Sequence, residues 1–170
     1  MADRKELPSD AEVRLRTLAP EDFDAIYEID QVCYPPQIAY SRRELSWYLR
    51  LPGAEGIVAE VGGKIVGFLV AACEKSAGHI VTIDVLEEHR RRAIGTALLR
   101  EAEERLGRKG VTLIQLETAV DNAAAVAFWK SHGYQSRGIL RNYYPGGLNA
   151  YAMMKSLATI SPDTLRRSSS

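Results

Sequence analysis

The sequence predicts an α/β protein with a mixed central sheet built around a parallel βαβ unit. A β-branched run at 79–85 is followed by apolar residues with helical spacing at 94–107 and by a second β-branched run at 111–118. Strands that are separated by a helix need a right-handed crossover, which makes them parallel. Two apolar runs around Gly62-Gly63 predict a tight hairpin, and an antiparallel hairpin makes the sheet mixed.

Length and composition fit one folded unit. The chain has 170 residues, of which 46% are hydrophobic, and this is enough to fill a core. We expect a domain at 12–157 between flexible, polar tails at 1–11 and 158–170. The 22 basic and 22 acidic residues balance, which disfavours nucleic acid and anionic membranes as partners. Because a long apolar block is missing, we expect a cytoplasmic protein, as a monomer or weak dimer.

The first part of the chain predicts one strand and two helices. Residues 13–18 alternate apolar and polar side chains, as a half-buried strand does. Pro20 opens a helix with an apolar face, and Pro35 ends it. Ser41 and Glu44 have the spacing of a capping box, so a second short helix begins there.

The remaining elements continue the alternation of strand and helix. In order they are a hairpin of strands at 56–61 and 64–72, the βαβ unit, a helix at 122–132, and strands at 134–140 and 150–157. Cys33 and Cys73 lie in different elements without a Cys-x-x-Cys spacing, which favours two buried free thiols over a redox or metal site.

A basic turn precedes the helix of the βαβ unit. Its residues are Arg90, Arg91, Arg92, Ala93, Ile94, Gly95 and Thr96. Cationic side chains and unpaired backbone N–H groups converge at such a helix start, which indicates a site for a phosphate-bearing ligand. The alternative is a solvated basic turn ahead of an ordinary helix.

The same turn resembles the Arg/Gln-x-x-Gly-x-Gly/Ala element with which the GNAT superfamily of N-acetyltransferases holds the pyrophosphate of acetyl-CoA. The resemblance extends over roughly 13–157 and implies the GNAT acyl-CoA N-acyltransferase fold. Ala93 stands where the family has its first glycine, and the turn tolerates alanine if its φ is negative. In the strand before the turn, the resemblance implies that the backbone of Ile83, Asp84 and Val85 pairs with the pantetheine arm. One N–H there would stabilise the oxyanion.

Residues 116–134 resemble the Leu-Glu-Val-Arg-x-x-Asn-x-x-Ala-x-x-x-Tyr-x-x-x-Gly-Phe block of the RimI-like branch, the ribosomal-protein-alanine N-acetyltransferases. The resemblance implies that Glu117 is a general base acting through water and that Asn122 contacts the cofactor. Trp129 takes the position of the family's tyrosine, which protonates the departing thiolate. Because an indole N–H is not a usable acid, Trp129 cannot take over that role, and we expect a slower enzyme. Alternatively, Glu117 is a surface carboxylate, Asn122 a plain helix cap and Trp129 a core residue or pocket wall.

Other groups can supply the missing proton, or the reaction can proceed without one. A thiolate with a pKa of roughly 8.5 leaves tolerably without help. Water or a nearby phenol can replace the acid, and the candidates are Tyr134, Tyr143 and Tyr144.

Tyr143 and Tyr144 belong to an Arg-x-Tyr-Tyr segment that also resembles the RimI-like branch, where it walls the acceptor channel. We expect one ring to point inward and one outward. The family places the other wall at the position of Tyr34. A Glu-Asp pair of the branch is replaced by glycines at 146 and 147, which leaves the acceptor preference open. The histidines are scattered without metal-ligand spacing, so we interpret His79, His89 and His132 as structural or exposed.

These patterns predict an acetyl-CoA-dependent N-acetyltransferase that needs no metal. An α-amine titrates near 7.7 to 8.0 and lysine near 10.4, so presenting the neutral amine at pH 7 costs about 1 kcal/mol for the former and roughly 4 to 5 kcal/mol for the latter. The N-terminus of a protein or peptide, a ribosomal protein among the candidates, is therefore the first choice of acceptor. The alternatives are a small-molecule amine acetyltransferase and a non-catalytic acetyl-CoA-binding module.

Overall fold

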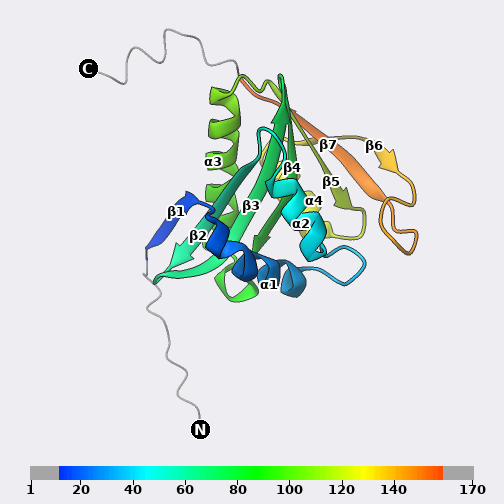
Figure 1. Cartoon of the computed structure of the whole chain (residues 1–170). Coiled ribbons are helices and arrows are strands. Elements are labelled where there is room, and N and C mark those ends of the chain that lie inside the picture. The colour runs from blue at the N-terminus through cyan, green and yellow to red at the C-terminus, as the bar shows by residue number, and fades with distance from the viewer. Residues whose placement is uncertain (1–11, 159–170) are drawn as a thin grey trace.

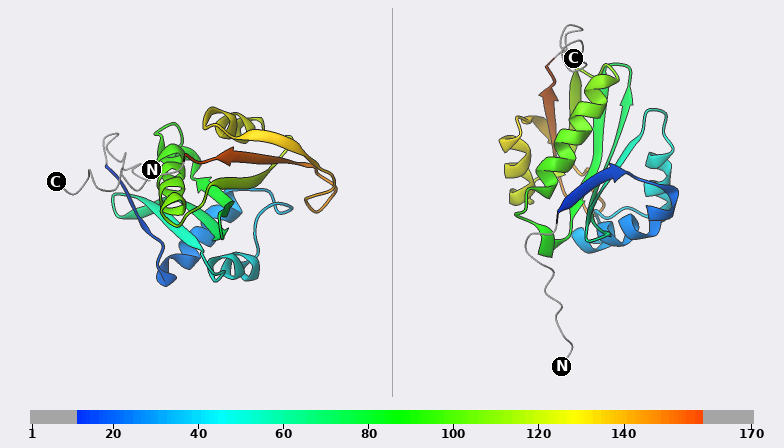
Figure 2. Two further views of the ribbon diagram at one scale, coloured as in Figure 1. Left: turned by 90° about the horizontal axis from the view of Figure 1, so that it is seen from above. Right: turned by 90° about the vertical axis from the view of Figure 1, so that its left-hand side faces the viewer.

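The structure is a computed structural model that describes residues 12–158. The two expected tails, 1–11 and 158–170, lie outside the described residues except for Ala158. The described chain forms a seven-stranded mixed sheet with the order β1-β2-β3-β4-β5-β7-β6 (Figure 1). Helices cover both faces, with α3 and α4 on one side and α1 and α2 on the other (Figure 2).

The elements follow the predicted order. The strands are β1 (Val13–Thr17), β2 (Glu55–Val61), β3 (Lys64–Glu74), β4 (Ala77–Val85), β5 (Leu113–Ala119), β6 (Gln135–Leu140) and β7 (Ala150–Ser156). The helices are α1 (Phe23–Cys33), α2 (Arg42–Leu49), α3 (Ile94–Arg108) and α4 (Ala123–Ser131), with short 3-10 turns η1 (Pro20–Asp22) and η2 (Glu87–His89). None of the helices in residues 12–158 has the length and apolarity needed to cross a membrane.

Local signals explain where the elements begin and turn. Ser41 Oγ accepts the Glu44 N–H at 3.2 Å, and the Glu44 carboxylate accepts the Ser41 N–H at 2.8 Å, so the predicted capping box starts α2. Gly62 and Gly63 have φ values of 60° and 77° between β2 and β3. This left-handed backbone suits glycine in a tight hairpin, as the sequence indicates.

The predicted βαβ unit is confirmed, and its two strands separate along their length. β4 and β5 are parallel and pair from Ala77 with Leu113 to His79 with Gln115. Beyond these pairs the strands diverge and become the walls of a cavity. The sheet is therefore split at the carboxyl ends of its parallel strands.

A β-bulge in β4 changes which side chains face each layer. Val70 of β3 pairs with Thr82 and Ala71 with Ile80, so Val81 is an extra residue. Ile80 packs in the core cluster under α3 and α4, and Val81 packs against the cluster under α1 and α2. Beyond the bulge the alternation is shifted by one residue, which brings Thr82 and Asp84 to the α1 side.

Candidate active site

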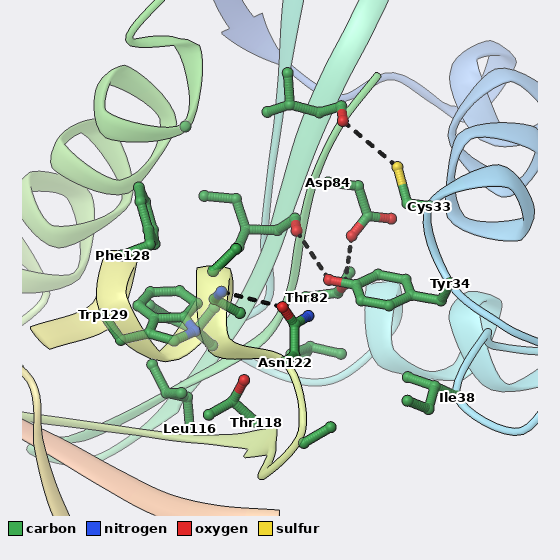
Figure 3. Close-up of a pocket in the computed structure, with 18 of the residues that line it drawn as sticks. Cys33, Tyr34, Ile38, Thr82, Asp84, Leu116, Thr118, Asn122, Phe128 and Trp129 are labelled. Carbon is green, nitrogen blue, oxygen red and sulfur yellow. Dashed lines mark hydrogen bonds between the residues drawn. The ribbon is translucent and has the colours of Figure 1, made fainter. Parts of the chain in front are cut away.

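A cavity of about 650 Å³ lies between β4 and β5 and reaches the start of α3 (Figure 3). It brings together almost all of the site residues that the sequence predicts. Those that line it are Tyr34, Ile83, Asp84, Val85, Arg90, Arg91, Ala93, Ile94, Gly95, Thr96, Glu117, Asn122, Trp129, Tyr143 and Tyr144. The remaining predicted residue, Arg92, lies beside the cavity, with its Nη1 3.3 Å from His89 Nδ1.

One end of the cavity is the N-terminus of α3. Ile94, Gly95 and Thr96 line it with the first turn of the helix, and in the described part of the chain no side chain caps this end. First-turn N–H groups are available to a ligand for this reason. Arg90 and Arg91 are exposed at the same end. The arrangement suits an anion such as a diphosphate.

Ala93 has a different backbone conformation from the one that the sequence argument required. Its φ is +58°, so the condition of a negative φ is not met. Arg91 is also left-handed, with φ +63°. Two left-handed residues within three positions turn successive side chains in different directions, which explains why Arg91 faces the cavity and Arg92 faces His89. An alanine here carries strain that a glycine would not.

The edge of β4 that faces the cavity offers hydrogen-bond donors. Three carbonyl oxygens on this edge already accept bonds from side chains. They are Val81 with the Tyr40 hydroxyl at 3.2 Å, Ile83 with the Tyr34 hydroxyl at 3.1 Å, and Val85 with Arg90 Nε at 3.0 Å. Because the N–H and C=O of one strand residue point to the same edge, the N–H groups of Ile83 and Val85 also face the cavity. This edge is suited to a carbonyl oxygen that gains negative charge.

Glu117 on β5 lies against His79 on β4. His79 Nε2 is 2.6 Å from Glu117 Oε2, and the two side chains are 38% and 25% exposed. The expectation that His79 is structural or exposed did not include this contact with the predicted general base. An ionised carboxylate only accepts, so His79 donates from Nε2, which leaves its Nδ1 as an acceptor while the ring is neutral. Glu117 itself lines the cavity, so its carboxylate offers acceptor atoms there.

Three tyrosines surround Glu117, and each remains a neutral donor. Burial, and then the Glu117 charge, raises the pKa of Tyr143 to about 12. Burial also raises the pKa of Tyr144 and of Tyr48, with Glu117 contributing in both cases. Both Tyr143 and Tyr144 line the cavity, and Tyr143 is the more exposed of the two at 46%, so one inward and one outward ring stays a prediction. They lie in a turn closed by Tyr144 N–H to Leu148 O at 3.0 Å, where strand alternation does not apply.

Helix α4 contributes a wall of the cavity. Asn122 Oδ1 accepts the Ala125 N–H at 3.1 Å, so it caps α4 and lines the cavity as well. Trp129 is 5% exposed and packs edge to face on Tyr134 at 5.2 Å between ring centroids. The Tyr134 hydroxyl donates to Glu103 at 3.0 Å on the far side of this core. Tyr134 therefore cannot serve as the phenol that replaces the family's acid.

Both cysteines are free, as the sequence predicts, but they are half-buried and not fully buried. Cys33 lines the cavity, and its thiol donates to Val85 O at 3.6 Å. Burial, and then the nearby Asp84 carboxyl, raises the pKa of this thiol to about 11. A protonated thiol is a poor nucleophile, so the geometry favours direct transfer between two substrates over an acyl-cysteine intermediate.

Three features together define an acyl-CoA-dependent transferase. They are the parallel strand pair that splits, the helix start that is suited to phosphate, and the carboxylate–histidine pair. The chain belongs to the acetyltransferase (GNAT) family, whose sequence model matches residues 23–134. The predicted membership and the predicted N-acetyltransferase activity are confirmed by this match and by relatives that cover 77% to 86% of the chain.

Relatives that are named for their activities support the RimI-like branch. An N-alpha-acetyltransferase of Sulfurisphaera tokodaii is 31% identical over 86% of this chain and 94% of its own. The [ribosomal protein bS18]-alanine N-acetyltransferase of Escherichia coli is 34% identical over 77% of this chain and 86% of its own. Among solved structures, Ard1 from Thermoplasma volcanium superposes with a TM-score of 0.80 at 26% identity, over 86% of this chain and 98% of that one.

Proposed function

We propose that this protein transfers the acetyl group of acetyl-CoA to the N-terminal α-amine of a protein or peptide. The observation that carries the proposal is Glu117, which lines the cavity between the diverging strands β4 and β5 and whose Oε2 lies 2.6 Å from His79 Nε2. The names of the relatives from Sulfurisphaera tokodaii and Escherichia coli support an α-amine as the acceptor. The activity would reside in residues 12–157 as one domain.

The donor would bind along β4 and the start of α3. First-turn N–H groups at Ile94–Thr96, together with Arg90 and Arg91, would hold the diphosphate of coenzyme A. The N–H groups of Ile83 and Val85 would face the pantetheine arm and the thioester carbonyl. The carbonyl groups of Ile83 and Val85 already accept hydrogen bonds from side chains, so they are not available to a ligand that donates. The N–H groups of this edge therefore favour a ligand atom that accepts, such as an oxyanion.

The acceptor would approach from the side of the tyrosines. Tyr143 and Tyr144 would donate to backbone carbonyls of the peptide, since their raised pKa values keep them protonated. Glu117 or His79, directly or through one water, would take the proton of the amine as its nitrogen bonds to the acetyl carbon. The C–S bond then breaks, and coenzyme A leaves as a thiolate.

The departing thiolate needs little help from the protein. Its pKa is roughly 8.5, so it leaves near neutral pH without an acid. Trp129 can form the wall but cannot donate a proton usefully. A site without its acid favours an easily deprotonated amine, and an α-amine is neutral to a far greater extent at pH 7 than a lysine is.

The test is the release of thiol from acetyl-CoA with purified protein and a panel of acceptors. We expect release with peptides that have a free α-amine, and much slower release with polyamines or amino acids. Glu117→Gln is the matched variant, because it keeps the shape of the side chain and removes its basicity. Equal release with every acceptor, or none with any peptide, would contradict the proposal.

A further inference from the structure

Asp30 of α1 and Asp84 of β4 form a pair of buried carboxyl groups beside the cavity. Asp30 is fully buried and Asp84 is 2% exposed, and the two carboxyl groups are close enough for each to influence the pKa of the other. Figure 3 shows Asp84 on the cavity wall next to Tyr34 and Thr82. Two charged carboxylates cannot share such a site without severe repulsion, so the pair must hold a proton.

The hydrogen bonds of the four carboxyl oxygens indicate where this proton would lie. Asp30 Oδ2 accepts the Tyr40 N–H at 2.7 Å, and Asp84 Oδ1 accepts the Thr82 hydroxyl at 2.8 Å. The other two oxygens, Asp30 Oδ1 and Asp84 Oδ2, are buried and have no donor among the described side chains and backbone groups. A proton that Asp84 Oδ2 shares with Asp30 Oδ1 would give both of them a partner. Asp30 already accepts a backbone N–H, so it is the better carboxylate.

The charged and titratable groups around the pair agree with a retained proton. Burial, and then the charge of Asp30, holds the pKa of Asp84 well above its usual value. Glu44 of α2 adds a further negative charge near Asp30. The cation Arg90 engages Val85 O and lies 3.9 Å from Cys33 Sγ. Tyr34 and Tyr40 are neutral, because burial raises the pKa of each phenol.

The pair joins two parts of the active site that are distant in sequence. Asp30 binds the backbone of Tyr40, at the end of the 34–40 segment, and Asp84 lies on β4. The same segment places the Tyr34 and Tyr40 hydroxyls on the carbonyls of Ile83 and Val81. The 34–40 segment therefore contacts β4 through the hydroxyls of Tyr34 and Tyr40 and through the carboxyl pair.

We propose that Asp84 is a positioning residue: it donates a proton to Asp30, and this bond holds the 34–40 segment on β4 so that an acceptor peptide can bind. The proposal rests on the proposed function, since the acceptor is taken to enter along this segment. It makes acceptor binding depend on pH. A raised pKa means that the bond is present at low and neutral pH and is lost as pH rises through the pKa of Asp84.

Asp84→Asn and Asp84→Ala test the proposal together. The asparagine amide donates to Asp30 at every pH, whereas alanine removes the bond. We expect Asp84→Ala to raise the acceptor KM by about tenfold, or about 1.4 kcal/mol, while the affinity for acetyl-CoA changes little. Asp84→Asn should restore the acceptor KM. It should also abolish the rise in KM that the wild-type protein shows at alkaline pH.

A control and a second readout keep the outcome decisive. Asp22→Asn changes another buried aspartate, which pairs with Arg16 away from the cavity, so it should lower thermal stability without changing the acceptor KM. Infrared difference spectra of wild type against Asp84→Asn should show the carbonyl stretch of a protonated carboxylic acid, and this readout needs no turnover. If no peptide is acetylated but the band is present, the proposed function fails and proton sharing stands.

Three results would overturn the positioning role. One is the absence of the protonated-acid band in the wild-type protein. Another is an acceptor KM in Asp84→Asn that is raised as much as in Asp84→Ala. The third is an Asp22→Asn variant with the same rise in KM as Asp84→Ala, which would show that general destabilisation causes the effect.

Discussion

Replacing Ala93 by glycine should stabilise the protein, although glycine within a helix usually destabilises. Ala93 is exposed and has a φ of +58° immediately before α3. A left-handed backbone costs an L-residue with a Cβ about 1–2 kcal/mol. Glycine adopts this conformation freely, so the substitution removes the strain at this position.

The magnitude follows from two opposing terms. The relief of about 1–2 kcal/mol is offset by about 0.4–1 kcal/mol, because glycine gives the unfolded chain more freedom. With the midpoints of both ranges, the net stabilisation of Ala93→Gly is about 0.8 kcal/mol. For a chain of this length it corresponds to a rise in Tm of about 1–4 °C.

The test is thermal unfolding of Ala93→Gly beside a matched variant, because the two substitutions should shift Tm in opposite directions. Ala97 lies within α3, where its N–H bonds to Ala93 O at 3.0 Å. Ala97→Gly should lower the free energy of unfolding by about 1 kcal/mol, because glycine disfavours a helix interior. The two substitutions remove the same methyl group but should shift Tm in opposite directions. A decrease in Tm with Ala93→Gly comparable to that of Ala97→Gly would refute the left-handed conformation at Ala93.

Three further outcomes are expected. Glu117→Gln should lower kcat by about 10²–10⁴-fold. His79→Gln should lower kcat less, since Glu117 keeps its basicity. Comparable thiol release by Glu117→Gln and wild type would disprove the assignment of Glu117 as the general base. Trp129→Tyr should raise kcat by about tenfold if its hydroxyl reaches the thiolate, whereas Trp129→Phe, measured alongside, should not. Arg16 lowers the pKa of Asp22, so this ion pair stabilises the fold above the unfolded pKa of about 3.9 and the contribution is lost as pH falls below it. Acid unfolding of Asp22→Asn should therefore lack this part of the pH dependence.

Local chemistry explains why the elements could be predicted. The capping residues Ser41 and Glu44 and the turn at Gly62-Gly63 act on their immediate neighbours, so a sequence pattern is sufficient to identify them. The βαβ unit follows from chain geometry alone. The short turn η2 has no comparable signal, and the sequence did not predict it.

Two contacts near the site could not be predicted from the sequence, because each depends on the register between strands. His79 meets Glu117 because β4 pairs with β5 in one particular register, which no local pattern reveals. The meeting of Asp30 and Asp84 depends on a bulge at Val81 that moves Asp84 to the α1 side. The interruption of the apolar stripe at Asp30 is visible in the sequence, but its partner is not.

The most direct test of the account is the position of the acetyl group on a peptide that carries both a free α-amine and a lysine. The peptide would be incubated with acetyl-CoA and the protein near pH 7, and fragmentation in a mass spectrometer would locate the added acetyl. We predict acetylation of the α-amine, strongly reduced with Glu117→Gln. Acetylation of the lysine, or α-amine acetylation that Glu117→Gln leaves unchanged, would contradict the account.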